Sequence, residues 1–331
     1  MKQYYLKPRP LNHEKDLKTT STLPNSWTST KYITYFNKTP KDIVCPHFWE
    51  LKWAYGCPFN CTYCYLQGTL YGKKQPKLKN IQDLTKELDK FLTKADQQGL
   101  KILLNAGELC DSLAVPKWTE ILINKIGNTL MKHEGHKILL VTKGGTKHIK
   151  PLLQKKESKK IFIVSFSLNS QTAAKKFEID APPPSERIKA AKLLIDNEYT
   201  VRLRIDPMIP IENWKKEYTQ LIENLVEHGL LKVRITLGTL RGLRKTINFS
   251  KNQEWKKYLQ KGEKTGWGLK IYPPLRDEIY RHTIQQLKKH GFKGEIALCK
   301  ETHNMWTRLK NLLYNPGQPE KWQNTKCNCT W

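Results

Sequence analysis

Three cysteines in one short segment have the spacing of ligands for an iron–sulfur cluster. Cys57, Cys61 and Cys64 follow the pattern C-x3-C-x2-C. Three thiolates on one loop can each reach a different iron of a cubane, which leaves the fourth iron without a protein ligand. An open iron adds nothing to simple electron transfer, but it suits a chelating substrate. The spacing therefore predicts a [4Fe–4S] cluster at which a small molecule is bound and activated.

This pattern is typical of radical S-adenosylmethionine (SAM) enzymes. In these enzymes SAM chelates the open iron, and an electron from the cluster cleaves SAM to a 5′-deoxyadenosyl radical that abstracts hydrogen. The alternative is a zinc site, which typically needs four ligands, often from two paired knuckles. No second C-x2-C occurs, although Cys327-Asn328-Cys329 could supply a distant ligand. We therefore predict the cluster and SAM as cofactors, with flavodoxin or ferredoxin as a reductant.

Short apolar runs alternate with amphipathic segments after the cysteine loop. Such an alternation is the pattern of βαβ units and a parallel sheet. Counting from Phe48 gives six units by about residue 240, fewer than the eight of a closed barrel. The sequence thus predicts an α/β fold, an open partial (β/α)6 barrel. Strands are predicted at 48–53, 101–105, 137–141, 161–166, 201–205 and 233–237, and helices at 81–92, after Pro116, at 185–194, 212–227 and 275–290.

Composition divides the chain into three parts. Residues 1–44 are polar and contain four prolines, so they are predicted to form an irregular basic arm. Residues 45–240 carry the barrel. Residues 241–331 are expected to pack on the barrel as an extension that ends in the cysteine-rich tail.

The charge favours a polyanionic partner. Lys and Arg number 58 against 30 acidic residues, which gives a net charge of +28. Nucleic acid is the commonest partner of so basic a chain. The alternative is a surface that uses lysine for solubility, because the lysines are spread along the whole sequence. No apolar run is long enough for a transmembrane helix and no signal peptide is evident, so a cytoplasmic location is expected.

Residues beyond the three cysteines resemble the spore photoproduct lyases. The resemblance covers roughly residues 45–240 and is carried by the segments 55–67, 141–143, 166–170, 177–178 and 187–191. It implies a partial β/α barrel, SAM binding and a DNA substrate. Members of this family act on thymine lesions in DNA and break an inter-base C–C bond after hydrogen abstraction. A base inside a duplex must be exposed before a radical can reach it.

Several residues near the ends of predicted strands are candidates for holding SAM. Tyr63 precedes the last cysteine, where radical SAM proteins commonly place an aromatic ring beside the adenine; core packing is its alternative role. Glu108 resembles the carboxylate that takes the SAM ammonium in a charge-assisted contact, with a solvated loop as the alternative. By position in the resemblance, Lys143 and Ser167 would hold the SAM carboxylate, and Asn169 is a further candidate for the same pocket.

The sequence departs from the lyases at one place that bears on the reaction. The lyases carry a cysteine after the second strand that returns a hydrogen atom to the product. Alignment on Asp111 puts Glu108 at that position, and Cys110, two residues later, points differently. The departure counts against a true lyase, and modification, rearrangement and repair of a base all remain open. Asp206, at the end of the fifth predicted strand, is a candidate on the substrate side.

Four further cysteines lie outside the lyase motif, namely Cys45, Cys299, Cys327 and Cys329. One hypothesis is a second metal centre, either an iron–sulfur cluster or zinc. Another is that one of them, or Cys110, donates the hydrogen atom that the lyases take from their own thiol. The third is that they are buried thiols that pack as small hydrophobic side chains.

Two other functions remain open from the sequence. A radical SAM enzyme that modifies a peptide or a small molecule would also explain extra cysteines near the end of the chain, but it would not call for a charge of +28. A non-enzymatic protein that binds zinc and nucleic acid is the second. Salt-sensitive binding to nucleic acid would favour the predicted nucleic-acid substrate over a peptide or a small molecule. A brown, oxygen-sensitive preparation would exclude the second.

Overall fold

A curved, mainly parallel sheet organises the computed structural model, which describes residues 27, 29–73, 75–313 and 325–331. The order of its eight strands is β1-β3-β7-β8-β9-β11-β12-β16. Neighbours from β3 to β16 pair in parallel, and β1 is an antiparallel edge strand. The strands are β1 (Ile33–Phe36), β3 (Phe48–Leu51), β7 (Leu103–Asn105), β8 (Lys137–Thr142), β9 (Phe162–Leu168), β11 (Thr200–Met208), β12 (Arg234–Thr239) and β16 (Ile296–Leu298).

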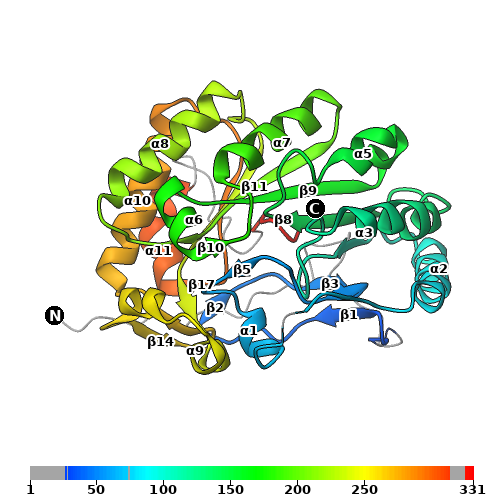
Figure 1. Ribbon diagram of the computed structural model, residues 1–331, viewed down its shortest axis with the longest axis horizontal. Coiled ribbons are helices and arrows are strands. Elements are labelled where there is room, and N and C mark those ends of the chain that lie inside the picture. Colours follow the sequence, from blue (N-terminus) through cyan, green and yellow to red (C-terminus); the bar gives the residue numbers. More distant parts are fainter. Residues whose placement is uncertain (1–26, 28, 74, 314–324) are drawn as a thin grey trace.

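Helices connect the parallel strands and surround the outer face of the sheet (Figure 1). The first long helix, α2 (Ile81–Gln97), forms and packs for two local reasons. Asn80 caps it by accepting a hydrogen bond from the Asp83 amide, and one face of the helix is apolar and buried. The others are α1 (Leu66–Thr69), α3 (Pro116–Ile121), a π-helical turn (Leu122–Gly127), α4 (Asn128–Leu130), α5 (Lys150–Gln154), a 3-10 turn (Lys156–Lys160), α6 (Gln171–Phe177), α7 (Pro184–Asp196), α8 (Trp214–Glu227), α9 (Arg244–Phe249), a 3-10 turn (Glu254–Leu259), α10 (Pro273–Lys289) and α11 (His303–Leu313).

Short strands outside the main sheet pin the loops around it. They are β2 (Ile43–Val44), β4 (Ala54–Tyr55), β5 (Asn60–Cys61), β6 (Lys77–Leu78), β10 (Glu178–Ile179), β13 (Arg241–Gly242), β14 (Glu263–Thr265), β15 (Gly268–Lys270) and β17 (Glu301–Thr302). The pairs β5–β10 and β2–β17 join segments far apart in the sequence. Each of these two pairs fixes the position of a cysteine, Cys61 in β5 and Cys45 directly after β2.

The predicted open partial (β/α)6 barrel is confirmed. The six strands counted from Phe48 are β3, β7, β8, β9, β11 and β12, and the sheet does not close on itself. Residues 241–331 do more than pack on it, because they add the parallel strand β16.

The prediction of an irregular arm over residues 1–44 is wrong for its last part. Residues 33–36 form β1, which pairs with β3 along its whole length. A strand of four residues is too short to show a clear periodicity, and its partner β3 supplies the pairing that stabilises it. Residues 1–26 and 28 lie outside the described residues.

The two faces of the sheet bury different sets of side chains. On the outer face, residues such as Leu104 and Phe162 pack against the helices. On the inner face, Leu103, Leu139 and Ile163 form a separate apolar cluster. Alternation along each strand separates the two sets.

The end of the chain enters the inner side of the sheet. Cys329 and Trp331 pack against the inner apolar cluster, and Figure 1 shows the C-terminus beside β8 and β9. Among the residues that the structure describes, no helix is long and apolar enough to cross a lipid bilayer.

Candidate active site

The three motif cysteines lie on a loop that is held at both ends by backbone contacts. Gly56 has a φ of 81°, a conformation that favours glycine, and its amide donates to the Leu109 carbonyl at 2.9 Å. In β5, Cys61 stands opposite Glu178 of β10. The loop is therefore fixed across the carboxyl ends of β7 and β9, where active sites of β/α folds gather.

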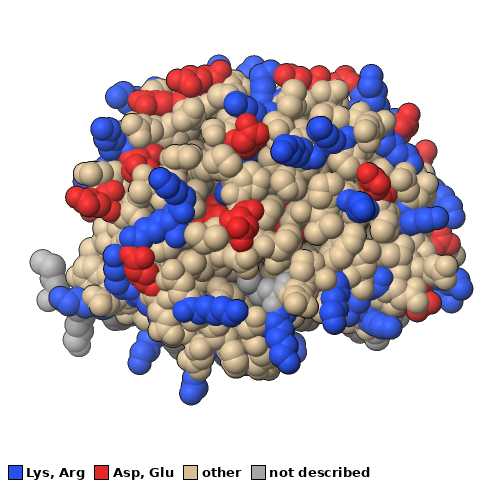
Figure 2. All heavy atoms as spheres, viewed as in Figure 1, with Lys and Arg blue, Asp and Glu red and all other residues tan. Residues whose placement is uncertain are grey.

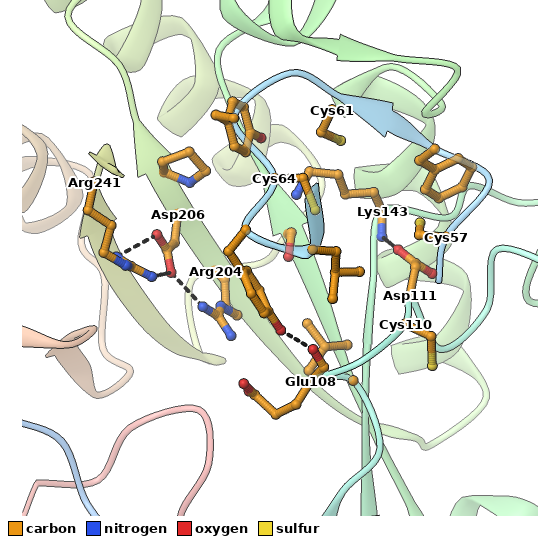
Figure 3. A pocket seen from close by; sticks show the side chains of 18 of the residues that line it. Cys57, Cys61, Cys64, Glu108, Cys110, Asp111, Lys143, Arg204, Asp206 and Arg241 are labelled. Carbon is orange, nitrogen blue, oxygen red and sulfur yellow. Dashed lines mark hydrogen bonds and ion pairs between the residues drawn. The ribbon is translucent and has the colours of Figure 1, made fainter. Parts of the chain in front are cut away.

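The three cysteines open into one cavity of ≈ 350 Å³. Figure 3 shows their side chains around Lys143, with Cys57 on the side of Asp111. The charged and polar residues that line the cavity with them include Glu108, Asp111, Lys143, Ser167, Arg204, Asp206, Arg241 and Lys300. They come from the ends of several strands and from the segments after β12 and β16. The fold thus brings together nearly all the residues that the sequence singled out for SAM.

The donor set of the loop fits a cubane better than a single metal ion. Within the described part of the chain, no three or more His, Cys, Asp or Glu side chains are arranged to hold one ion. A cubane takes one thiolate per iron, so its ligands stand farther apart than the ligands of a single ion. Burial raises the pKa of the Cys61 thiol to about 12, so cluster assembly must displace its proton.

A buried ion-pair network supports the loop from behind. Arg187 Nη1 lies 2.5 Å from Glu178 Oε2, and both side chains are almost completely buried. The Tyr63 hydroxyl donates to the same carboxylate. Burial alone would raise the pKa of Glu178, but Arg187 and Lys143 lower it to about 2. Tyr63 lines the cavity, with its hydroxyl committed to this network; its place beside the adenine of SAM stays a prediction.

The ionised Glu178 predicts a loss of stability in acid. Its folded-state pKa of about 2 lies below the ordinary value of 4.5. The stabilisation is therefore complete above about pH 4.5 and is lost as the pH falls toward 2. We expect the difference in unfolding free energy between the protein and a Glu178→Gln variant to shrink by about 3 kcal/mol between pH 6 and pH 2. Urea denaturation across this range measures it, and a constant difference would contradict the account.

Lys143 and Ser167 line the cavity as the resemblance implies. Asp111 positions the lysine, because its carboxylate accepts from the Lys143 amide at 2.6 Å and from Thr142 Oγ1 at 2.7 Å. Burial would lower the pKa of Lys143, but Glu178 and Cys61 raise it above its ordinary value. The ammonium therefore stays charged inside the cavity.

Asn169 stands behind the cavity wall rather than in it. The residues that line the cavity in the described chain do not include it. Its amide nitrogen donates to Glu178 at 3.2 Å and to the Pro207 carbonyl at 3.0 Å, and its oxygen accepts from Tyr218 at 2.9 Å. These contacts occupy the side chain, so the structure does not favour the predicted SAM contact. The resemblance located the right strand end but not the direction of the side chain.

Glu108 lies in the cavity but faces away from the cysteine loop. Its carboxylate accepts from Asn105 Nδ2 at 3.0 Å and lies 3.8 Å from Lys300 Nζ. Figure 3 shows the side chain extending away from the three cysteines. This orientation favours the substrate side of the cavity over the predicted contact with the SAM ammonium.

Asp206 is clamped between two arginines. Arg204 Nη2 donates to it at 2.5 Å, and Arg241 donates to both carboxylate oxygens at 3.2 and 3.1 Å. Burial would raise the pKa of Asp206, but Arg241 and Arg204 hold it far below its ordinary value. The two arginines were missed in the sequence. The signal was present, because Arg202, Arg204 and Asp206 alternate with apolar residues in a central strand.

A glycine on the neighbouring strand leaves room for this clamp. A Cβ at Gly238 would lie 2.5 Å from Asp206 Oδ1. We expect Gly238→Ala to displace the Asp206 carboxylate and to lower the free energy of unfolding by about 1–3 kcal/mol. We also expect it to lower the turnover of substrate by the iron-loaded enzyme. Gly229→Ala serves as a comparison, because nothing lies within 4 Å of its added Cβ, although its φ of +68° adds strain. Unchanged turnover in Gly238→Ala would show that the exact position of Asp206 is unimportant.

Of the candidate hydrogen donors, Cys110 lines the cavity. It is 5% exposed, and its thiol points to the Ala106 carbonyl at 3.6 Å. Cys299 lies next to the cavity wall, with its sulfur 3.5 Å from Arg204 Nη2. Cys329 contacts Asn105, the residue that holds Glu108.

Lys and Arg are spread across the face of the molecule in Figure 2 rather than gathered in one patch. The basic composition therefore gives no single basic face in this view.

Comparison with known proteins identifies the family. The family model described as spore photoproduct lyase matches residues 47–256. The chain is 25% identical over 252 residues to the spore photoproduct lyase of Bacillus subtilis, which covers 72% of this chain and 71% of that protein. The corresponding protein of Clostridium acetobutylicum is 26% identical over 178 residues, covering 53% of this chain and about half, 51%, of its own length.

Solved structures agree in fold. A spore photoproduct lyase complexed with dinucleoside spore photoproduct superimposes with a TM-score of 0.65 at 19% identity, over 75% of each chain. A variant of the lyase with bound AdoMet and the same dinucleoside gives a TM-score of 0.64 at 18% identity, over 76% of this chain and 77% of that one. The family match includes the cysteine loop and most of the cavity, and the chain therefore belongs to the spore photoproduct lyase family of radical SAM enzymes.

Proposed function

We propose that this enzyme uses its [4Fe–4S] cluster and SAM to abstract hydrogen from a base of nucleic acid, with DNA as the first candidate. The observation that carries the proposal is the composition of the cavity. The cysteine loop stands on one side, and the clamp of Arg204, Asp206 and Arg241 also lines the cavity. One cavity thus offers a cofactor side and a substrate side.

On the cofactor side, Cys57, Cys61 and Cys64 would hold the cluster, which when bound supplies the electron that cleaves SAM. Lys143 offers a charged ammonium and Ser167 a hydroxyl for the SAM carboxylate. Tyr63 gives the cavity an aromatic wall.

We expect Lys143→Met to weaken SAM binding by roughly ten- to a hundredfold, because a hydrogen bond to a charged group contributes about 1.5–3 kcal/mol. Equilibrium binding of SAM to the iron-loaded enzyme measures the change. Lys150→Met removes an exposed lysine and is the matched control. Equal affinities in the two variants would remove Lys143 from the SAM site.

On the substrate side, charge favours an anionic group. Arg204 and Arg241 share one carboxylate, so the clamp keeps an excess of positive charge. Arginine suits phosphate because its guanidinium can form two parallel hydrogen bonds. The net charge of +28 extends the same preference to the whole chain. The bound dinucleoside spore photoproduct in solved relatives supports a nucleic-acid substrate here.

We further propose that the reaction is a modification or a rearrangement rather than lesion repair. The support is the placement of Glu108 and Cys110. Alignment on Asp111 puts Glu108 at the position of the thiol of the lyases, and Cys110 is directed to a backbone carbonyl at the cavity wall. Both observations support a reaction that does not use a thiol placed as in the lyases.

The test is anaerobic. Iron-loaded, reduced enzyme is incubated with SAM and with undamaged DNA, DNA containing spore photoproduct, or RNA, with flavodoxin or dithionite as the electron donor. Mass spectrometry of the digested nucleosides is expected to show a nucleoside of altered structure from undamaged nucleic acid. Recovery of thymine from the lesion would instead make the enzyme a repair lyase.

A further inference from the structure

Four cysteines outside the SAM motif converge at one place in the fold. Cys45 and Cys329 belong to one packed cluster. Cys299 and Cys327 both act electrostatically on the Cys45 thiol, and the side chains of Cys327 and Cys329 interact directly. The four residues come from three segments far apart in the sequence, so local chain proximity does not explain the grouping.

Backbone pairing and two buried arginines bring these segments together. In the β2–β17 pair, Val44 stands opposite Glu301, which places Cys45 near the turn that carries Cys299. The tail is held by its carbonyl groups. Arg202 donates to Asn328 and Thr330 at 2.5 and 2.7 Å, and Arg234 donates to Cys327 and Thr330 at 3.0 and 2.9 Å. The fold thus fixes the tail where its thiols meet the other two.

The surroundings of the four thiols are strongly cationic. Each of five positive side chains interacts electrostatically with at least one of them, namely Arg202, Arg204, Arg234, Arg241 and Lys300. Three carboxylates, those of Asp206, Glu108 and Glu295, pair with four of these cations and offset part of the charge. Four cysteine thiolates around a metal centre carry a net negative charge, which buried cations offset.

The residue between the two tail cysteines supplies an independent observation. Asn328 is 1% exposed, and within the described residues neither its amide nitrogen nor its oxygen has a hydrogen-bond partner. A buried amide without partners is costly. Hydrogen bonds to sulfur are among the contacts that tune iron–sulfur clusters, so an amide at this position fits a centre that offers acceptor sulfurs.

We propose that Cys45, Cys299, Cys327 and Cys329 hold a second iron–sulfur cluster, next to the substrate side of the cavity. Four cysteines are the usual ligand set of [2Fe–2S] and [4Fe–4S] clusters. In such a cluster each thiolate binds a different iron, so its ligands stand farther apart than those of a single ion. Among the described residues no three or more His, Cys, Asp or Glu side chains are arranged around one ion. Cys299 lies 3.5 Å from Arg204, which lines the cavity.

The test removes the first cluster and asks what remains. The full-length variant with Cys57, Cys61 and Cys64 all replaced by alanine is reconstituted anaerobically with iron and sulfide. It is expected to retain about two or about four irons per chain, with matching sulfide and visible absorbance. Further replacement of Cys327 and Cys329 by alanine is expected to remove that iron. Adding Cys110→Ala to the triple variant instead is the matched control and should leave the iron in place.

The readout is independent of SAM cleavage, so the second cluster can fail without the proposed function failing. Circular dichroism checks that each variant is folded. If the triple variant is unfolded, iron in the unaltered protein decides, because two clusters require about six to eight irons and one requires about four. A folded triple variant without iron, or with zinc in its place, would overturn the proposal, as would about four irons in the unaltered protein.

Discussion

Replacing Cys61 with alanine is expected to abolish SAM cleavage. A cubane bound through three thiolates loses one of its three protein ligands, and a second iron is left open beside the one that SAM needs. Replacing a residue that only hydrogen-bonds to a metal ligand typically lowers metal affinity or activity by about 10–100-fold. Loss of a ligand itself should therefore lower 5′-deoxyadenosine formation by more than about 100-fold. Chromatography of the anaerobic reaction measures the product.

Cys110→Ala is the matched control for this change. Cys110 is a buried cysteine of the same cavity but stands outside the motif. The Cys110→Ala enzyme should keep its iron and its SAM-dependent change in the electron paramagnetic resonance spectrum, whereas Cys61→Ala should lose that change. If Cys61→Ala cleaved SAM normally, the cysteine loop would not be the cluster site.

The second large effect is expected on stability. Arg187→Met should lower the free energy of unfolding by about 3–5 kcal/mol, because removing one partner of a buried ion pair leaves the charge of the other without compensation. The charge left behind is Glu178, whose side chain is 1% exposed. Lys143 and Tyr63 remain nearby, but neither replaces the contact at 2.5 Å. Urea denaturation of the iron-free protein at neutral pH measures the loss.

A double variant separates the lost charge from lost packing. Replacing both partners of a buried pair by apolar residues of similar volume is often close to neutral. We therefore expect Arg187→Met combined with Glu178→Leu to recover much of the stability lost in Arg187→Met alone. A loss below about 1 kcal/mol in the single variant, or no recovery in the double one, would show that the ion pair matters little.

The elements that the sequence predicted well are those encoded locally. The cysteine spacing lies within one loop, and the strands from β3 to β12 are apolar runs that need no knowledge of their neighbours. Lys143, Ser167 and Asp206 were placed correctly at the cavity because the carboxyl ends of parallel strands meet at one edge of the sheet.

The features that the sequence did not reveal depend on contacts between distant segments. Arg241 reaches Asp206 from β13, outside the predicted barrel. Glu108 lies 3.8 Å from Lys300, a residue far along the chain. The convergence of Cys45, Cys299 and the tail depends on the β2–β17 pair, whose strands have two residues each. Such short pairings have no periodicity to detect.

The most direct test of the central claim is the formation of 5′-deoxyadenosine by the iron-loaded, reduced enzyme under anaerobic conditions. We expect that SAM is cleaved to 5′-deoxyadenosine, that candidate nucleic acid increases the yield, and that Cys61→Ala forms none above background. The absence of 5′-deoxyadenosine from fully iron-loaded enzyme, with every reductant and every nucleic acid offered, would contradict it.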